Sequence, residues 1–195
     1  MDFKNVKIWI DTETGGLDPK KHSLLQLAAV AEDNGNIVDR FQTNIFHKDY
    51  CVTREALRVN KIDVSKIEPS NTFECRDLPT AIGSFIFFCK KYTEKDKNIQ
   101  LYGQNTIFDI NFLREAMNQI GINYDDHFTR RYMDLQSISL FMKDLKLIDV
   151  NSVSMDNLRR YFGITNPDSH TALADVEDII AIYYKYQNII KRGGK

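Results

Sequence analysis

The amino-acid sequence predicts an α/β protein with a mixed β-sheet flanked by helices. Three apolar segments near the N-terminus have the length and composition of strands, and the last two are joined by Asn34-Gly35-Asn36, a strong hairpin signal. The rest of the chain alternates helical patterns with two further strand-like segments. Three antiparallel strands followed by this alternation imply a five-stranded mixed sheet that carries helices on its faces.

The expected strands are short apolar runs bounded by polar or turn residues. VKIWI ends in a cluster of acids and glycines, and the third run has apolar residues at the alternating positions Ile37, Phe41 and Ile45. NIQLYG, which precedes a helical pattern, is a fourth strand. The five expected strands are 6–11, 23–33, 36–46, 98–103 and the first part of 131–142.

The expected helices carry apolar residues on one side, at intervals of three and four positions. Leu78, Ile82 and Phe85 follow this spacing in the second helix. Gly121 and Gly163 follow two of the patterns, where a glycine is a typical helix end. The expected helices are 52–60, 78–92, 105–121, the second part of 131–142, 156–164 and a last helix that begins near Ser169.

Composition and charge indicate one globular domain. The chain has 195 residues, of which 43% are hydrophobic and 27% charged, enough for a sizeable core. The net charge of −1 provides no overall basic field for nucleic acid, but bound cations can create a local one over a cluster of acids. We expect a single domain over 1–195, with a flexible basic tail at 191–195.

Cysteine usage and hydropathy indicate the cellular location. The three cysteines match no zinc or redox spacing, and Cys89 falls at an apolar core position. The N-terminal apolar run is short and ends in acids, unlike a signal peptide, and no apolar run has membrane-spanning length. We therefore expect a soluble, cytoplasmic protein with reduced thiols.

Two acids, Asp11 and Glu13, follow the first apolar run in IDTETGG. Side chains of a strand alternate between its faces, so residues two positions apart lie on the same face. Neighbouring carboxylates repel each other unless a positive charge lies between them, and a divalent cation is the usual one. The alternative is a strand end that enters a polar turn at Gly15-Gly16, and the pair alone does not decide between the two.

A third acid, Asp109, lies at the start of a helix that follows an apolar strand. Asn105 or Thr106 can cap this helix, which puts Asp109 in its first turn. The helix dipole stabilises an acid in a first turn without any function, so the position fits either a structural or a metal-binding role.

The segment HTALADVEDII carries His170 and Asp175. Five positions apart, they would point about 140° from each other on a regular helix. Both can face one site if His170 lies in the loop before the helix and Asp175 near its first turns. A histidine before a helix is often only a solvated surface group, whereas a carboxylate beside Leu173 and Val176 needs a partner.

DTETGGL, NTIFD and HTALADV together resemble the three motifs of the DEDDh (DnaQ-like) 3′→5′ exonucleases, in the ribonuclease H-like superfamily. The motifs follow the order of that family and span nearly the whole chain, and LLQLAAV and DLQSISL between them agree as well. One departure is Gln104, where many relatives have a histidine. The resemblance implies a ribonuclease H-like fold for the mixed five-stranded sheet.

The resemblance also implies a site for two divalent ions. Its acids would be Asp11, Glu13, Asp109 and Asp175, and His170 would accept the proton of the attacking water. In this assignment Asp11 bridges both ions, Glu13 and Asp175 complete one site, and Asp109 serves the other. Oxygen ligands favour Mg²⁺ or Mn²⁺ over zinc, and two such ions suit phosphodiester hydrolysis.

Residues beside the acids are candidate contacts of the terminal nucleotide. Gly15 could allow backbone amides to approach the 3′ end, or simply form a tight turn. Phe108 could stack on a base, although its place in an amphipathic helix also fits core packing. The pairs Arg130-Arg131 and Arg159-Arg160 are candidate phosphate contacts or solvated charges. The nucleotide-binding candidates are Thr14, Gly15, Leu17, Asn105 and Phe108.

We therefore expect a metal-dependent 3′→5′ exonuclease that releases nucleoside 5′-monophosphates from single-stranded ends, with DNA as the first substrate, as in a proofreading subunit. An RNA-trimming enzyme like ribonuclease T or oligoribonuclease is the alternative. A non-catalytic nuclease-like module that binds nucleic acid is a third possibility. The expected partners are DNA or RNA 3′ ends and, in the proofreading case, a DNA polymerase subunit, and the protein would be a monomer or a homodimer.

Overall fold

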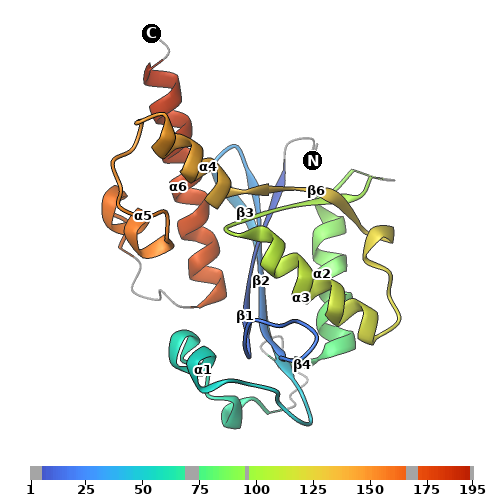
Figure 1. The fold of residues 1–195 in the computed structure, drawn as a ribbon. Helices are drawn as coiled ribbons and strands as arrows, with labels where there is room; N and C mark the ends of the chain where they lie inside the picture. The colour runs from blue at the N-terminus through green and yellow to red at the C-terminus, as the bar shows by residue number, and fades with distance from the viewer. Residues whose placement is uncertain (1–5, 69–74, 95–96, 166–170, 194–195) are drawn as a thin grey trace.

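In a computed structural model, the chain forms a six-stranded mixed sheet between two groups of helices (Figure 1). The structure describes residues 6–68, 75–94, 97–165 and 171–193. The first three strands are antiparallel, as the sequence predicts. The fifth strand pairs parallel with the first, and the sixth pairs parallel with the fifth. The sheet order is β4-β3-β2-β1-β5-β6, with β1 Lys7–Thr14, β2 Leu24–Asp33, β3 Asn36–Phe46, β4 Cys75–Asp77, β5 Ile99–Gly103 and β6 Phe128–Asp134.

The sheet has six strands and not the expected five. The additional strand, β4, has three residues and pairs parallel with the end of β3 at the edge of the sheet. Three residues are too few to show an alternating pattern, so sequence periodicity does not reveal this strand. The hairpin between β2 and β3 is confirmed, because Asn34 and Gly35 both have the positive φ that a tight turn between twisted strands requires.

The α-helices of the described residues lie in the segments that the sequence predicts. The last helix begins at Ala172, and Ser169, its expected start, lies outside the described residues. This helix continues to Gly193, so it includes the first three residues of the expected tail 191–195. The helices are α1 Arg54–Asn60, α2 Leu78–Lys91, α3 Thr106–Gln119, α4 Leu135–Asp144, α5 Met155–Phe162 and α6 Ala172–Gly193, with 3-10 turns at Val64–Lys66 and Tyr124–Asp126.

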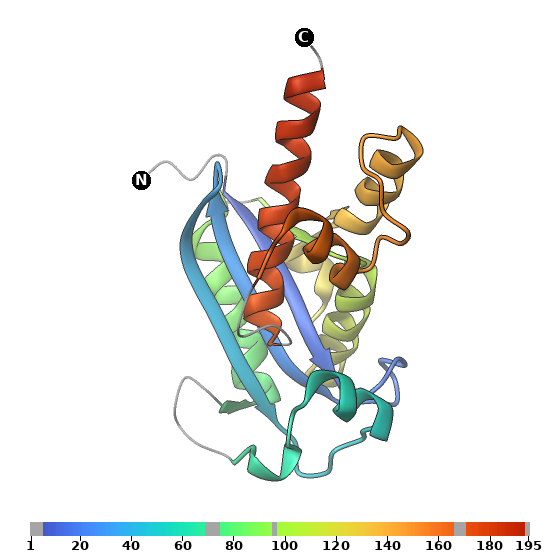
Figure 2. The same ribbon diagram turned by 90° about the vertical axis from the view of Figure 1, so that its left-hand side faces the viewer.

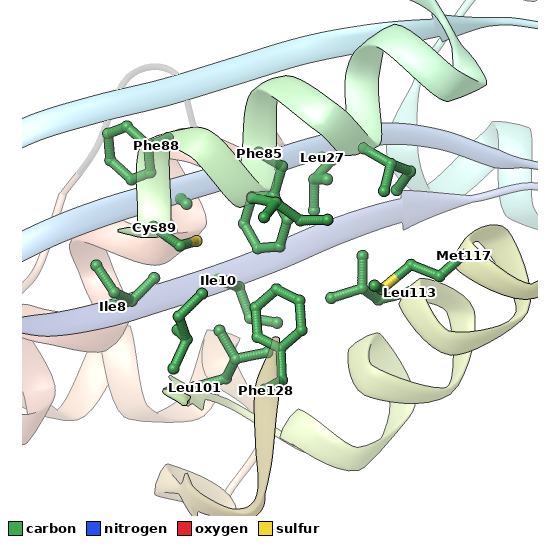
Figure 3. Close-up of a cluster of buried hydrophobic side chains, with 14 of the residues drawn as sticks. Ile8, Ile10, Leu27, Phe85, Phe88, Cys89, Leu101, Leu113, Met117 and Phe128 are labelled. Atoms are coloured by element: carbon green, nitrogen blue, oxygen red, sulfur yellow. The ribbon is translucent and has the colours of Figure 1, made fainter. Parts of the chain in front are cut away.

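Each face of the sheet packs against its own hydrophobic core. Helices α2 and α3 cover one face, where Ile8 and Ile10 of β1 meet Phe85 and Leu113 (Figure 3). Helices α4, α5 and α6 cover the other face, and the fully buried Trp9 packs there (Figures 1 and 2). Alternate residues of β1 therefore point to opposite layers, which decides where the acids at its end point.

The position of Cys89 agrees with the sequence analysis. Cys89 is completely buried in the core under α2, as predicted, and none of the three cysteines forms a disulfide (Figure 3). Among the described residues, the structure contains no helix of sufficient length and apolar character to cross a membrane.

Candidate active site

Asp11 and Glu13 lie within β1, on the face of the sheet that α6 covers. Trp9, two residues before Asp11, packs in the core beneath α6. Because side chains alternate along a strand, Asp11 and Glu13 point to the same face as Trp9. The sequence prediction of a shared face is therefore confirmed. Both views place the N-terminal end of α6 near the end of the sheet where β1 finishes (Figures 1 and 2).

The first turn of α6 adds a third carboxylate, Asp175. One oxygen from each of Asp11, Glu13 and Asp175 lies within 4.8 Å of the other two. Gln26 of β2 attaches the start of α6 to the sheet, because its side-chain oxygen accepts the backbone N–H of Ala172 at 3.1 Å. Gln26 also lies opposite Glu13 in the strand register. The sequence analysis missed this anchor, whose signal is one polar residue inside the apolar run LLQLAAV.

Asp109 approaches the cluster from the opposite layer. It lies in the first turn of α3, as predicted, and is 3% exposed. Thr12, which points away from the face of Asp11 and Glu13, donates a hydrogen bond of 2.6 Å to the Asp109 carboxylate. Asp109 is not part of the three-residue group within 4.8 Å. The structure therefore brings three of the expected acids together and holds the fourth beside them.

Burial and mutual repulsion raise the pKa values of these acids. Burial is the larger cause for Asp11, whose pKa lies well above its usual range, and the three other acids raise it further. Burial and the charges of Asp175 and Asp109 raise the pKa of Glu13 to about 8. Burial raises the pKa of Asp109 to about 7, although the hydrogen bond from Thr12 opposes the rise. Without a cation, part of the cluster therefore holds protons near neutral pH.

The cluster has the chemistry of a site for a hard divalent cation. Its ligand atoms are carboxylate oxygens, which Mg²⁺ and Mn²⁺ prefer, and they come from β1 and α6, with Asp109 of α3 beside them. A cation among them would offset the repulsion that raises their pKa values. The donor set therefore fits the ions that the sequence motifs imply.

Arg159 of α5 contacts acids of α6. Its Nη2 is 2.6 Å from Oδ1 of Asp175, and its Nε is 2.6 Å from Oδ2 of the buried Asp178. Arg159 is therefore part of an ion-pair network inside the protein, and this network does not support a phosphate contact at Arg159. Arg130, another candidate phosphate contact, forms an ion pair with Asp125 at 2.7 Å. The sequence analysis missed Asp178, although acids three positions apart on a helix share one side.

His170, the expected proton acceptor, lies outside the described residues. The next residue, Thr171, is described, and its carbonyl oxygen accepts the backbone N–H of Asp175 at 3.0 Å. The role of His170 stays a prediction from the sequence.

A pocket of about 550 Å³ opens beside the acids. Three of the candidate nucleotide contacts line it, Thr14, Leu17 and Phe108, together with Glu13 and Val59. Leu17 is 84% exposed and Val59 is 68% exposed, although both side chains are apolar. Apolar side chains left exposed next to a polar cluster form a surface that a flat aromatic ligand can cover.

Gly15 does not line this pocket, and it packs closely against a neighbouring segment of the chain. A Cβ atom at Gly15 would lie 2.3 Å from the carbonyl oxygen of Cys51. The Gly15 carbonyl accepts the N–H of Thr53 at 2.6 Å, so the turn after β1 packs directly against the segment that leads into α1. This contact supports the tight-turn alternative.

Asn105 also lies outside the lining of the pocket. It adopts a left-handed conformation with φ of 53°, and its side chain does not cap α3. The backbone N–H groups of Asn105 and Thr106 instead donate to Oδ1 of Asp134, at 2.6 and 3.4 Å. The Asp134 side chain also caps α4, because it accepts the backbone N–H groups of Gln136 and Ser137. One carboxylate therefore accepts backbone N–H groups at the start of both helices. Asn105 therefore occupies the N-cap position of α3, as expected, but its side chain makes no capping hydrogen bond.

Comparisons with known proteins identify relatives of this chain by sequence and by fold. A sequence profile of the Exonuclease family (RNase_T) matches residues 8–183, which include all four acids. A PolC-type DNA polymerase III from Thermotoga petrophila is 23% identical over 194 residues, covering 98% of this chain and 13% of that protein. An oligoribonuclease from Mannheimia succiniciproducens is 25% identical over 207 residues, covering 100% of this chain and 97% of that protein.

Solved structures share the fold. E. coli exonuclease I, in a zinc-bound complex with single-stranded DNA, superimposes with a TM-score of 0.80 at 16% identity, over 96% of this chain and 42% of that chain. A moderately thermophilic exonuclease I from Methylocaldum szegediense gives a TM-score of 0.78 at 19% identity, over 94% of this chain and 41% of that chain. The expected ribonuclease H-like architecture is confirmed. Because the profile extends over most of its length, the chain belongs to the Exonuclease family, in the DEDDh (DnaQ-like) group that its three motifs resemble.

Proposed function

We propose that the protein is a 3′→5′ exonuclease that releases nucleoside 5′-monophosphates from single-stranded ends. The observation that carries the proposal is the convergence of Asp11, Glu13 and Asp175 beside Asp109 in a chain of the Exonuclease family. In each cycle a water oxygen bonds to the terminal phosphorus, and the bond from phosphorus to the preceding 3′ oxygen breaks. That oxygen takes a proton, which leaves a strand shortened by one nucleotide with a new 3′-hydroxyl.

Two Mg²⁺ or Mn²⁺ ions are part of this proposal. Asp11, Glu13 and Asp175 would hold one ion, and Asp11 and Asp109 would hold the other. When bound, two such ions activate the attacking water and stabilise the leaving oxygen. Thr12 orients Asp109 through its 2.6 Å hydrogen bond, and the attachment of α6 to β2 holds Asp175 near β1.

His170 would accept the proton of the attacking water. The usual histidine pKa of about 6.5 suits this transfer near neutral pH. We expect His170→Ala to lower the turnover number by about 10²–10⁴ without changing metal affinity. A near-normal turnover number at neutral pH would assign the proton to another group.

The pocket beside the acids would receive the terminal nucleoside. Leu17, Val59 and Phe108 offer apolar contacts to the faces of a base without regard to its identity. Thr14 and the neighbouring Glu13 line the same pocket, and Glu13 also belongs to the cluster of acids. We expect Leu17→Ala to raise KM more than it lowers kcat, because Leu17 would contact substrate and not the reacting atoms.

Two substrate classes follow from this site. The PolC-type relative supports DNA and a role with a polymerase, which is our first expectation. The oligoribonuclease relative, matched over 97% of its length, supports a second candidate, the trimming of short RNA. A location in the cytoplasm and a monomeric or homodimeric state complete the proposal.

The decisive experiment compares matched DNA and RNA strands, single- and double-stranded, each labelled at the 5′ end. With Mg²⁺ we expect products that shorten by one nucleotide at a time from the 3′ end, and with EDTA we expect none. The preferred sugar is read from the ratio of kcat/KM values. Tight binding of the strands without any hydrolysis in Mg²⁺ or Mn²⁺ would instead support a nuclease-like binding module.

A further inference from the structure

Arg159 joins two acids of α6 through two different nitrogen atoms. Nη2 contacts Asp175 and Nε contacts Asp178, both at 2.6 Å, while Asp156 of its own helix lies farther away at 3.4 Å. The Arg159 side chain is 11% exposed, and that of Asp178 is 5% exposed. Helix α5, which carries Arg159, packs against α6 (Figures 1 and 2). The arginine is therefore enclosed between two helices and held at both ends of its planar group.

The position of Asp175 needs such support. Its carboxylate shares a small space with those of Asp11 and Glu13, and three like charges at this distance repel one another. An aspartate side chain can rotate about two bonds, so repulsion alone would turn it away from the cluster. A short hydrogen bond from a fixed guanidinium restricts that rotation before any cation binds.

We propose that Arg159 is a positioning residue, which holds Asp175 in the orientation that binds metal. The inference rests on the proposed metal-dependent function and adds a residue to it. Arg159 contacts Asp175 and not the reacting atoms. Outer partners that orient a metal ligand typically contribute about 10- to 100-fold to metal affinity.

The charge of Arg159 does not by itself make it a competitor of the metal. Asp178 is a buried counterion at 2.6 Å, so the two groups together are close to neutral. The field of a neutral pair falls off faster with distance than that of a single charge. What remains at Asp175 is a directional hydrogen bond, which favours one arrangement of the carboxylate.

A charge-neutral double variant isolates this effect. Arg159→Gln with Asp178→Asn removes both members of the pair and leaves the net charge of the protein unchanged. The matched control is Arg160→Gln, the next residue of α5, which is exposed and contacts Asn157. Mn²⁺ affinity is measured by calorimetry on the nucleic-acid-free protein, after circular dichroism has confirmed that each variant is folded.

We expect the double variant to bind Mn²⁺ about 10-fold more weakly or worse, and the control to bind as the wild type does. In the nuclease assay the Mn²⁺ concentration for half-maximal rate should rise, while the rate at saturating Mn²⁺ stays near that of the wild type. A general weakening of the fold would not produce this split. Unchanged or tighter Mn²⁺ binding would overturn the proposal.

A second variant covers the case in which the double variant does not fold. Arg159→Lys keeps the charge, but a single ammonium group cannot hold Asp175 and Asp178 as a planar fork does. We expect weaker Mn²⁺ binding than in the wild type, and equal binding would contradict the proposed role. If the wild type itself neither binds Mn²⁺ nor hydrolyses a strand, the proposed function fails. If it does both and the variants bind normally, only the role of Arg159 fails.

Discussion

Acids lie at both ends of the contact between α6 and the sheet: one buried glutamate at one end and three half-buried carboxylates at the other. At one end Glu32 of β2, which is completely buried, accepts hydrogen bonds from four donors. The Lys7 ammonium and the Trp9 indole donate at 3.2 and 3.1 Å, and the Gly35 N–H and the Tyr184 hydroxyl donate as well. Here the fold has surrounded a carboxylate with donors, as a structural acid requires.

At the other end Asp11, Glu13 and Asp175 crowd against one another. Burial raises the pKa of Glu32, but the hydrogen bonds outweigh burial and the pKa is lowered overall. Burial also raises the pKa of Glu13, and there neighbouring acids add to the effect, so it reaches about 8. The difference teaches that burial alone does not mark a functional acid. Acids that face other acids mark a place for a cation.

The largest expected effect is the loss of hydrolysis in Asp11→Ala and in Asp175→Ala. Each change removes an oxygen ligand from the proposed metal site, so activity should fall to the background of the assay. Asp11→Ala also relieves repulsion, so its melting temperature in EDTA should be equal to that of the wild type or higher, whereas Asp175→Ala also loses the ion pair with Arg159. Activity is measured on a labelled single strand with Mg²⁺. Retained hydrolysis in either variant would contradict the two-metal proposal.

The opposite result is expected at Glu32. Glu32→Ala leaves Lys7, Trp9 and two further donors without their buried acceptor, and removing one member of such a buried charged pair costs about 3–5 kcal/mol. The free energy of unfolding is measured by urea denaturation. Glu32→Gln, which keeps the shape and one acceptor, should cost less. A loss of hydrolysis by folded Glu32→Gln protein would mean that the two ends are coupled.

The sequence predicted those features that depend on local patterns. Asp11 and Glu13 share a face because they are two positions apart on a strand, and Asn34-Gly35 turns the chain between β2 and β3. Cys89 is in the core because its helix has a regular apolar spacing. In each case the sequence pattern and the structural feature that it predicts involve residues only a few positions apart.

The resemblance to a family predicted that the acids of three distant segments meet, but other contacts between distant segments were not predicted. Asp134 caps α3, whose first residue is 28 positions away, and Arg159 reaches Asp178 across 19 positions. From the sequence, Glu32 is expected to be the polar end of a strand. Tyr184, which donates a hydrogen bond to it, is 152 positions away. No periodicity encodes such pairs. Glu32 and Asp178 need hydrogen-bond partners because they are buried, and they become buried only when α6 packs on the sheet.

The two ends should also respond to pH in opposite directions in metal-free protein. The raised pKa of Glu13 gives stability that is fully present below about pH 4.5 and is lost as the pH rises through about 8. The lowered pKa of Glu32 gives stability that is present at neutral pH and is lost in acid. We expect the melting temperature in EDTA to fall from about pH 6 to about pH 8, and added Mg²⁺ to oppose this fall.

Glu13→Gln tests the origin of that slope. The amide cannot ionise, so the fall in melting temperature between about pH 6 and about pH 8 should become smaller, while the decline in acid that involves Glu32 should stay. Differential scanning fluorimetry across this range measures both. An unchanged slope in Glu13→Gln would remove Glu13 as its cause.

The smallest expected effect is that of Tyr184→Phe, which deletes one of the donors to Glu32 and keeps the ring. Because the other donors remain, we expect the free energy of unfolding to fall by about 1 kcal/mol. Hydrolysis should not change, because nine helical positions, roughly 14 Å along the axis of α6, separate Tyr184 from Asp175. The matched control is Tyr183→Phe, whose ring packs on Trp9 and should leave stability within about 0.5 kcal/mol. An altered Mn²⁺ requirement in Tyr184→Phe would show that the donor-rich end helps to hold the acid-rich end, and that α6 transmits the effect between them.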